Sequence, residues 1–336
     1  MKKIEIIAEA GVNHNGKLIL AKKLALYAKK AGADYIKFQI FNPEEIAISK
    51  LKKAPYQKKG SINKSENQKE MLNNLSLTHQ NFDKLINYCK KIKIKFLASI
   101  FDLTSLEYLK TKTNIIKIGS SEITNYILLK YLARWNKKLI ISTGMCGIKD
   151  IREAINFLKK NGQKNKITIL HCNTAYPTPY EDVNLLTIKK LKDSFSFDIG
   201  YSDHALGNEV SFAAVALGAV MIEKHFTLDK KLKGPDHSIS CDFEELKLLV
   251  EGTKKIFKTL RIKNNTLTNS EKKNFLLVKK YLVAKQNIKK GEKFTLNNIT
   301  SKRTGGGIEA KKFQKVINKR ANKKFKIDQI ISINEK

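Results

Sequence analysis

The sequence is poor in cysteine, proline and arginine. Its four cysteines, Cys89, Cys146, Cys172 and Cys241, lie far apart and form no CxxC pair. This spacing excludes a zinc site made of cysteines alone and argues against a framework of disulfide bonds. We therefore expect reduced thiols and a cytoplasmic protein.

Long hydrophobic runs are also missing. The most apolar stretch, 210–222, has only 13 residues, whereas a membrane-spanning helix needs about 20. The N-terminal segment MKKIEIIAEAG begins like a secretory signal, but Glu5 and Glu9 interrupt it and no small-residue cleavage site follows. We expect a first β-strand there and no membrane association.

Negative charge is scarce, with 31 acidic residues against 65 basic ones and a net charge of +34. Only five of the basic residues are arginine, the side chain that nucleic-acid interfaces prefer for reading bases. The lysines are spread along helical segments without interleaved aromatic residues for base stacking. We expect no specific nucleic-acid partner, while weak, salt-sensitive binding stays open.

Short apolar runs recur along the chain and alternate with amphipathic helical segments such as 18–31 and 151–161. Repeated strand–helix alternation is typical of parallel strands joined by helical crossovers, and eight strands close a (β/α)₈ TIM barrel. An open sheet of six strands is the alternative. The eight expected strands are 4–8, 35–39, 95–100, 115–118, 139–142, 167–171, 197–201 and 220–223.

Three regions follow from this pattern: a barrel over 1–262, a polar linker over 263–278 and a small turn-rich domain over 279–336. A unit of this size buries little core on its own, so we expect it to lean on another surface. A Lys-, Asn- and Ser-rich insertion at 42–78 follows the second strand. It should lie on the catalytic face of a barrel.

Polar residues stand where the expected strands end, and in a TIM barrel these ends build the active site. Lys37 and Lys117 at inward strand ends, near small hydroxyls and glycine turns, predict a site for an anion such as a phosphate next to a carboxylate. For each lysine, the alternative is a surface side chain.

Two of the six histidines, His204 and His225, end neighbouring strands. Two imidazoles with open positions for water and substrate suit Mn²⁺ or a similar divalent ion, and structural hydrogen bonding is the alternative. We expect orienting or structural roles for three others, His14, His171 and His237.

Nine motifs in the same order resemble those of the bacterial sialic acid synthases, over nearly the whole chain. They read IAEAGVNHNG, YIKFQ, KIGSSEITN, ISTGM, HCNTAYPTPYEDVNL, GYSDHALG, IEKHFTLD, GPDHSIS and KRTGGGI. The family includes N-acetylneuraminate synthase and the similar N,N'-diacetyllegionaminate synthase. The resemblance also implies that the C-terminal domain is the family's antifreeze-like (SAF) domain.

The resemblance implies a transferase that condenses phosphoenolpyruvate with an N-acetylated mannosamine-type sugar and water and releases phosphate. Our first expectation is an N-acetylneuraminate synthase acting on N-acetylmannosamine. The alternative is an N,N'-diacetyllegionaminate synthase acting on 2,4-diacetamido-2,4,6-trideoxymannose.

The resemblance also assigns roles to individual residues. Metal ligands are His204 and His225, for Mn²⁺ or Mg²⁺, and Glu9 lies close to the reacting groups. Contacts to phosphoenolpyruvate fall on Lys37, Ser99, Lys117, Ser120, Ser142, Thr174 and Ser202. Contacts to the sugar fall on Gln39, Tyr176, Asp236 and Arg303, with Glu122 and Glu223 as supporting carboxylates.

A homodimer is implied as well, in which the C-terminal domain caps the partner's barrel and Arg303 completes the partner's site. Three residues depart from the family pattern: Ile100 replaces a proline, Ser121 a glycine, and Thr304 the proline after the arginine. None of these changes removes a charged group or an expected metal ligand.

Two other functions remain open at this point. A barrel aldolase could use Lys37 or Lys117 to form a Schiff base and would need no metal. A non-enzymatic polycation could bind nucleic acids or acidic glycans through its lysines.

Overall fold

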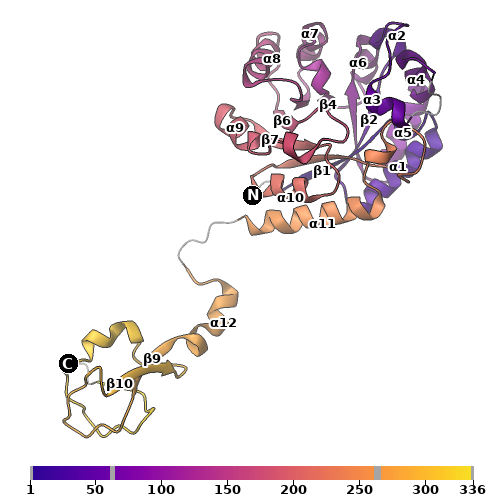
Figure 1. Cartoon of the computed structure of the whole chain (residues 1–336). Helices are drawn as coiled ribbons and strands as arrows, with labels where there is room; N and C mark the ends of the chain where they lie inside the picture. The colour runs from indigo at the N-terminus through magenta and orange to yellow at the C-terminus, as the bar shows by residue number, and fades with distance from the viewer. Residues whose placement is uncertain (1–2, 61–64, 261–265, 334–336) are drawn as a thin grey trace. The chain divides into compact units, whose positions relative to one another are not determined.

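The computed structural model describes residues 3–60, 65–260 and 266–333. The chain divides into two compact units, 1–260 and 261–336. In the first unit, eight parallel strands close into a barrel in sequence order, surrounded by helices (Figure 1). The expected TIM barrel is therefore confirmed, and the six-strand alternative is wrong. The strands are β1 (Glu5–Gly11), β2 (Tyr35–Ile40), β3 (Lys95–Ile100), β4 (Ile115–Ile118), β5 (Lys138–Ser142), β6 (Ile167–Cys172), β7 (Asp198–Asp203) and β8 (Met221–His225).

Two apolar layers hold the barrel together. One fills its interior below the mouth and includes Ile7, Leu97 and Leu170. The other lies between the strands and the helices, where residues from both are fully buried. Because parallel strands are covered on both sides, they read as continuous apolar runs. The main helices of this unit are α1 (Leu18–Ala31), α5 (His79–Lys91), α6 (Leu103–Leu109), α7 (Tyr126–Trp135), α8 (Ile148–Lys160), α9 (Thr187–Ser194), α10 (Glu209–Ala216) and α11 (Phe243–Thr259).

The insertion after β2 contains three short helices, α2 (Pro43–Ile46), α3 (Pro55–Gly60) and α4 (Gln68–Leu75). Its apolar side chains form a satellite core in which Phe41 and Met71 are buried. Gly16, in the β1–α1 loop, has a positive φ of 68°, and a Cβ there would come within 2.6 Å of the Asn74 carbonyl oxygen. The insertion therefore packs closely against that loop.

The second unit has a small core of its own, built around Phe294 and Phe325. Its strands β9 (Lys280–Ala284) and β10 (Ile299–Arg303) pair antiparallel. The 3₁₀ helix η4 (Ala310–Lys315) belongs to the same unit. Part of the expected linker 263–278 forms a helix, α12 (Asn269–Val278), which begins with a capping box between Thr268 and Glu271. The expected boundary at 262 lies outside the described residues.

In the part of the chain that the structure describes, no helix is both long enough and apolar enough to cross a lipid bilayer.

Candidate active site at the barrel mouth

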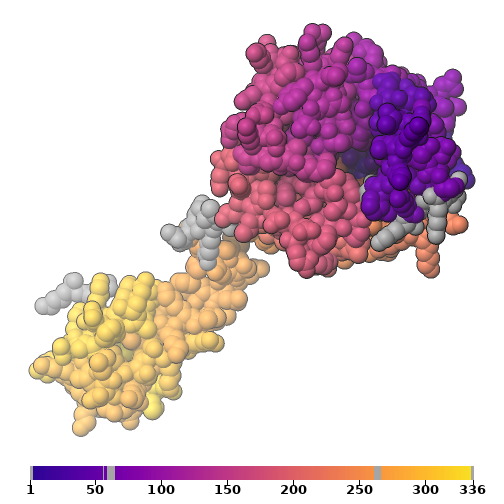
Figure 2. All heavy atoms as spheres, turned by 45° about the horizontal axis from the view of Figure 1, so that its top comes forward, coloured from indigo at the N-terminus to yellow at the C-terminus, as the bar shows by residue number. Residues whose placement is uncertain are grey.

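A cavity of about 660 Å³ opens at the C-terminal ends of the strands. In Figure 2 the surface is hollowed beside the indigo residues of the insertion. Twelve of the fourteen residues expected at the site line this one cavity; Asp236 and Arg303 do not. The twelve are Glu9, Lys37, Gln39, Ser99, Lys117, Ser120, Ser142, Thr174, Tyr176, Ser202, His204 and His225.

Two buried lysines and one buried carboxylate form the charged centre of the cavity. Glu223 Oε1 lies 3.2 Å from Lys37 Nζ and 3.7 Å from Lys117 Nζ, and it accepts a hydrogen bond of 2.9 Å from the Ser202 hydroxyl. Lys117 also donates to Ser142 Oγ at 2.6 Å. The two lysines are buried, so the surface alternative for both is wrong. Two lysine side chains converging on this centre offer cationic partners to an anionic substrate.

Protonation in this centre follows from burial and from charge. Burial would raise the pKa of Glu223, but the two lysines outweigh it and lower that pKa to about 2. Burial lowers the pKa of Lys117. Burial would also lower the pKa of Lys37, but the carboxylates of Glu223 and Glu9 raise it. Lys37 and Glu223 therefore stay charged at neutral pH.

Glu9 at the end of β1 is the candidate base. Its Oε1 lies 3.3 Å from Lys37 Nζ and 3.4 Å from the amide nitrogen of Gln39. Its Oε2 is buried and has no hydrogen-bond partner among the described residues. Burial raises the pKa of Glu9 to about 7, helped by the nearby Glu223 carboxylate, while Lys37 opposes the rise. A carboxyl group with this pKa can accept or donate a proton at neutral pH.

His204 and His225 meet across the mouth, with ring centroids 5.4 Å apart. His204 Nδ1 lies 2.5 Å from the Asn173 carbonyl oxygen and donates a hydrogen bond to it. The proton of this hydrogen bond is on Nδ1, so Nε2 is the nitrogen that can act as a ligand. The Nδ1 of His225 is buried and has no hydrogen-bond partner among the described residues, and burial lowers the pKa of His225 well below its usual value. Burial would lower the pKa of His204, but the Cys172 thiol, the Asn173 carbonyl and Glu223 raise it. Deprotonated at Nε2, His204 could join His225 in holding a divalent ion whose other positions are filled by water and substrate. The described residues contain no cluster of three or more His, Cys, Asp or Glu side chains that could hold a metal.

A narrow turn closes the cavity on the side of β4, β5 and β6. Ser120 Oγ accepts a hydrogen bond of 3.0 Å from the Gly144 backbone N–H. A Cβ at Gly144 would lie 2.3 Å from Thr174 Oγ1 and 2.8 Å from Ser120 Oγ. Only glycine fits there, and its absent side chain lets the two hydroxyls approach each other. Backbone N–H and hydroxyl groups at such a turn suit phosphate oxygens.

Three further residues were expected to contact the sugar. The centroid of the Tyr176 ring lies 4.3 Å from that of His204, one of the two candidate metal ligands. Asp236 is buried with its Oδ2 3.8 Å from His225 Nδ1, and burial raises its pKa to about 6. Arg303 is exposed at the end of β10, in the second unit.

Several residues of the site were missed by the sequence reasoning. Cys172, counted only as a reduced thiol, lines the cavity with its Sγ 3.8 Å from His204 Nδ1. The insertion contributes side chains such as Ile46 and Leu72. Cys172 could have been found because it ends β6 two residues before Thr174, an expected site residue. The insertion residues carry no comparable signal.

The other motif histidines, for which orienting or structural roles were expected, do not line the cavity. His14 Nδ1 accepts a hydrogen bond from the Gly16 N–H, and His237 Nδ1 lies 2.6 Å from Thr227 Oγ1. Burial lowers the pKa of both His14 and His237 to about 4. His171 Nε2 donates to the Val183 carbonyl oxygen at 2.7 Å.

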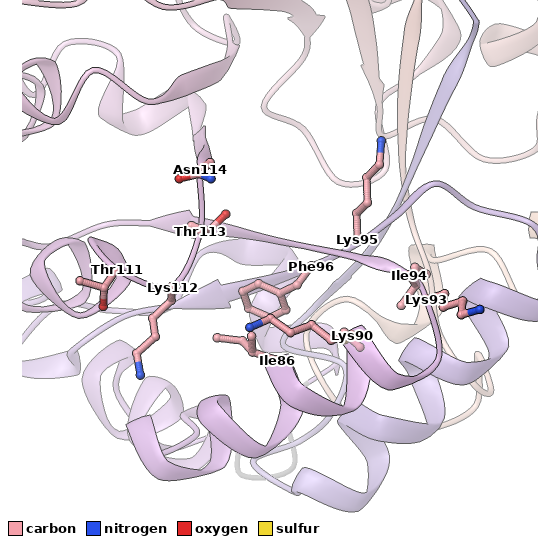
Figure 3. A pocket seen from close by; sticks show the side chains of 11 residues that line it. Ile86, Lys90, Lys93, Ile94, Lys95, Phe96, Thr111, Lys112, Thr113 and Asn114 are labelled. Atoms are coloured by element: carbon pink, nitrogen blue, oxygen red, sulfur yellow. The ribbon is translucent and has the colours of Figure 1, made fainter.

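A second hollow, of about 510 Å³, lies at the opposite ends of β3 and β4 (Figure 3). Figure 3 shows its lysines Lys95 and Lys112 pointing in different directions rather than toward one ligand. Both are engaged elsewhere, with Glu5 at 3.3 Å and Asp83 at 2.7 Å. Active sites of TIM barrels lie at the C-terminal ends of the strands, so we assign the site to the cavity at the mouth.

Comparison with known proteins identifies the family of the two units. The NeuB family model matches residues 24–265 and the SAF domain model matches residues 279–335, which confirms the expected antifreeze-like domain. The "N,N'-diacetyllegionaminic acid synthase" of Campylobacter jejuni is 49% identical over 333 residues, covering 98% of this chain and 99% of that protein. A protein of the same name from Legionella pneumophila is 38% identical, covering 94% of this chain and 89% of that protein. The crystal structure of "N-acetylneuraminic acid (sialic acid) synthetase" from Leptospira borgpetersenii, in complex with citrate, has a TM-score of 0.71 and 35% identity over 81% of this chain and 90% of that chain.

Proposed function

Because this chain belongs to the NeuB family, whose members are enzymes that condense phosphoenolpyruvate with acylated amino sugars, we propose that it makes N,N'-diacetyllegionaminate from 2,4-diacetamido-2,4,6-trideoxymannose. The similarity to two diacetyllegionaminic acid synthases, 49% and 38% identical to this chain, favours this acceptor over the N-acetylmannosamine that we expected first. The observation that carries the reaction type is the pair of buried lysines beside Glu223 at the barrel mouth.

Phosphoenolpyruvate carries a phosphate and a carboxylate, and the proposed site offers each of them a cation and small donors. Lys37 and Lys117 bind the two anionic groups, and the hydroxyls of Ser142 and Ser120 donate to their oxygens. Since Glu223 already balances part of the lysine charge, it keeps both ammonium groups in place before the substrate arrives. Holding the substrate in this way directs its C3 toward the acceptor aldehyde and removes much of the orientational cost of the reaction.

C3 of phosphoenolpyruvate forms a bond to the aldehyde carbon with the electrons of the enol double bond, which leaves cationic character at C2. The C=O π electrons of the aldehyde move to its oxygen, which takes up a proton from solvent. Water adds at C2, and the tetrahedral product loses phosphate by cleavage of the C–O bond. Glu9, with a pKa of about 7, accepts the proton of that water at neutral pH. Gln39 and Tyr176 orient the acceptor. A divalent ion held by His204 and His225 would supply Lewis-acid polarisation of the aldehyde oxygen.

We also propose a homodimer in which Arg303 completes the partner's site. A planar guanidinium can grip an amide carbonyl or a pair of hydroxyls, which a lysine cannot do in the same geometry. The exposure of Arg303 leaves it available to another chain. The cytoplasm is the proposed location, because phosphoenolpyruvate is a metabolite of the cell interior.

The test is a phosphate-release assay with phosphoenolpyruvate, Mn²⁺ and each acceptor sugar in parallel. We expect release with both sugars and a higher kcat/KM for the diacetamido sugar. Borohydride with a keto acid should leave both Lys37 and Lys117 unmodified, since no Schiff base forms. Absence of phosphate release with either acceptor would contradict the proposed condensation.

A further inference from the structure

Part of the cavity lining is apolar and comes from the insertion and the loop after β3. Ile46 from α2, Leu72 from α4 and Phe101 from the loop after β3 line it. All three are only partly buried against the satellite core around Phe41 and Met71. Part of each side chain therefore faces the cavity. We call this group of three residues the apolar wall.

The apolar wall is held by contacts on the side away from the cavity. Asn42 caps α2 by accepting from the Glu44 N–H at 3.2 Å, and its own N–H donates to Asp102 at 2.8 Å. Lys69 on α4 lies 2.5 Å from the Glu44 carboxylate, which links the two short helices. These contacts join α2, which carries Ile46, to Asp102 and to α4, which carries Leu72.

The chemistry of the insertion side is unusual for this chain, in which 29% of residues are charged. Among the described residues 42–60 and 65–78, the side chains that line the cavity are all uncharged. Gln57 and Gln68 are the polar ones. The side-chain oxygen Oε1 of Gln57 accepts a hydrogen bond of 2.9 Å from the Ala54 backbone N–H. The side-chain NH₂ group of Gln57 is therefore the part that can meet a ligand. The lining residues from the insertion are Ile46, Ala54, Pro55, Gln57, Gln68 and Leu72.

We infer that the apolar wall binds the deoxygenated end of the acceptor and selects a 6-deoxy sugar over one with a hydroxyl at C6. This inference rests on the proposed function, because it concerns the acceptor of that reaction. A methyl group at C6 gains from leaving water for the apolar wall. A hydroxyl there would lose its water partners and find none on Ile46, Leu72 or Phe101. The NH₂ group of Gln57 and the amide of Gln68 can hydrogen-bond an acetamido group, which carries one N–H donor and one carbonyl acceptor.

A hydrophobic pocket discriminates against an added hydroxyl by no more than about 100-fold. We therefore expect the wild-type protein to prefer 2,4-diacetamido-2,4,6-trideoxymannose over N-acetylmannosamine by about 10- to 100-fold in kcat/KM. Ile46→Asn and Leu72→Gln should each lower kcat/KM for the 6-deoxy sugar by about 10-fold. Values for N-acetylmannosamine should stay unchanged or rise, and the KM for phosphoenolpyruvate should not move.

Ile48→Asn is the matched control, because Ile48 lies two residues from Ile46 and its side chain is 75% exposed. This variant should retain the wild-type preference. Thermal unfolding of each variant shows whether it folds, and calorimetric binding of each sugar gives the preference without turnover.

The outcomes separate the two proposals. If Ile46→Asn and Leu72→Gln lose both acceptors equally, or if the wild-type protein binds the 6-deoxy sugar no more tightly than N-acetylmannosamine, the inference about the apolar wall is wrong while the condensation stands. Preferential binding of the 6-deoxy sugar without any phosphate release would support the apolar wall and contradict the proposed function.

Discussion

The ion pair between Lys224 and Asp203 yields a sharp prediction about stability. It joins β7 and β8 one residue before His204 and His225, and the two side chains are only 3% and 0% exposed. The Lys224 ammonium lies 2.9 Å from Asp203 Oδ2 and donates to the Ala205 carbonyl oxygen at 2.5 Å. Removing the lysine leaves a carboxylate without its counter-ion in the layer between the barrel and α10.

The substitution to make is Lys224→Met, which keeps the length of the side chain and removes its charge. Removing one partner of a buried pair typically costs about 3–5 kcal/mol. Asp203 keeps hydrogen bonds from the Ser211 hydroxyl at 2.6 Å and the Ala205 N–H at 2.9 Å. We therefore expect a loss near the lower end, about 3 kcal/mol in the free energy of unfolding of the barrel. The double variant Asp203→Asn with Lys224→Met should be less destabilised than Lys224→Met alone, because no buried charge is left.

Urea unfolding can be followed by the fluorescence of Trp135, the one tryptophan in the sequence, which lies in α7 of the barrel unit. Lys149→Met is the control, since Lys149 is 87% exposed and lies 4.0 Å from Glu153 one helical turn away. That variant should change the free energy of unfolding by less than about 0.5 kcal/mol. If Lys224→Met is as stable as the control, the buried pair does not hold the strand ends together.

Four other predictions concern the proposed reaction. Excess EDTA should abolish phosphate release, and Mn²⁺ should restore it. His204→Ala and His225→Ala should each lower the rate by orders of magnitude and weaken Mn²⁺ binding, which electron paramagnetic resonance measures. Full activity in EDTA would contradict the metal proposal. Lys117→Ala should raise the KM for phosphoenolpyruvate far more than that for the sugar, and unchanged kinetics would remove Lys117 from the anion site. Because Glu9 must be ionised to accept a proton, kcat/KM should fall as pH drops through about 7, and Glu9→Gln should lose that limb; a wild-type profile in Glu9→Gln would show that another group titrates. Arg303→Ala and His225→Ala chains, each inactive alone, can be unfolded and refolded together. If pairing is random, half of the dimers are mixed and each has one intact site of two, so about a quarter of wild-type activity should return. No recovery in verified mixed dimers would refute a shared site.

The barrel could be predicted because its strands carry a strong local signal. A parallel strand covered on both faces must be apolar along its length, so β3 and β4 were predicted with the bounds that the structure gives, 95–100 and 115–118. The α1 helix at 18–31 was predicted in the same way from its periodicity. Polar residues at the ends of such strands stand out, and the closed barrel brings them to one mouth.

The charge partners at the mouth could not be read from the sequence. Glu223 was expected only as a supporting carboxylate, yet it is the counter-ion shared by Lys37 and Lys117. In a chain with 60 lysines, nothing local distinguishes these two from the rest until their burial is known. Their depth, and the rise in the pKa of Glu9 that burial produces, are properties of the closed barrel.

The sequence by itself determined the number and order of the strands, the small C-terminal domain, and the polar side chains at each strand end, because each depends on residues close together in the chain. Only the tertiary structure decided which of those side chains meet, because the register of neighbouring strands fixes their distances. It also decided that the side chains of Ile46 and Leu72 line the cavity. Both residues belong to a lysine-rich insertion without clear periodicity. The direction of a side chain in such a segment depends on the path of the backbone, which contacts such as the close approach of Gly16 to Asn74 determine.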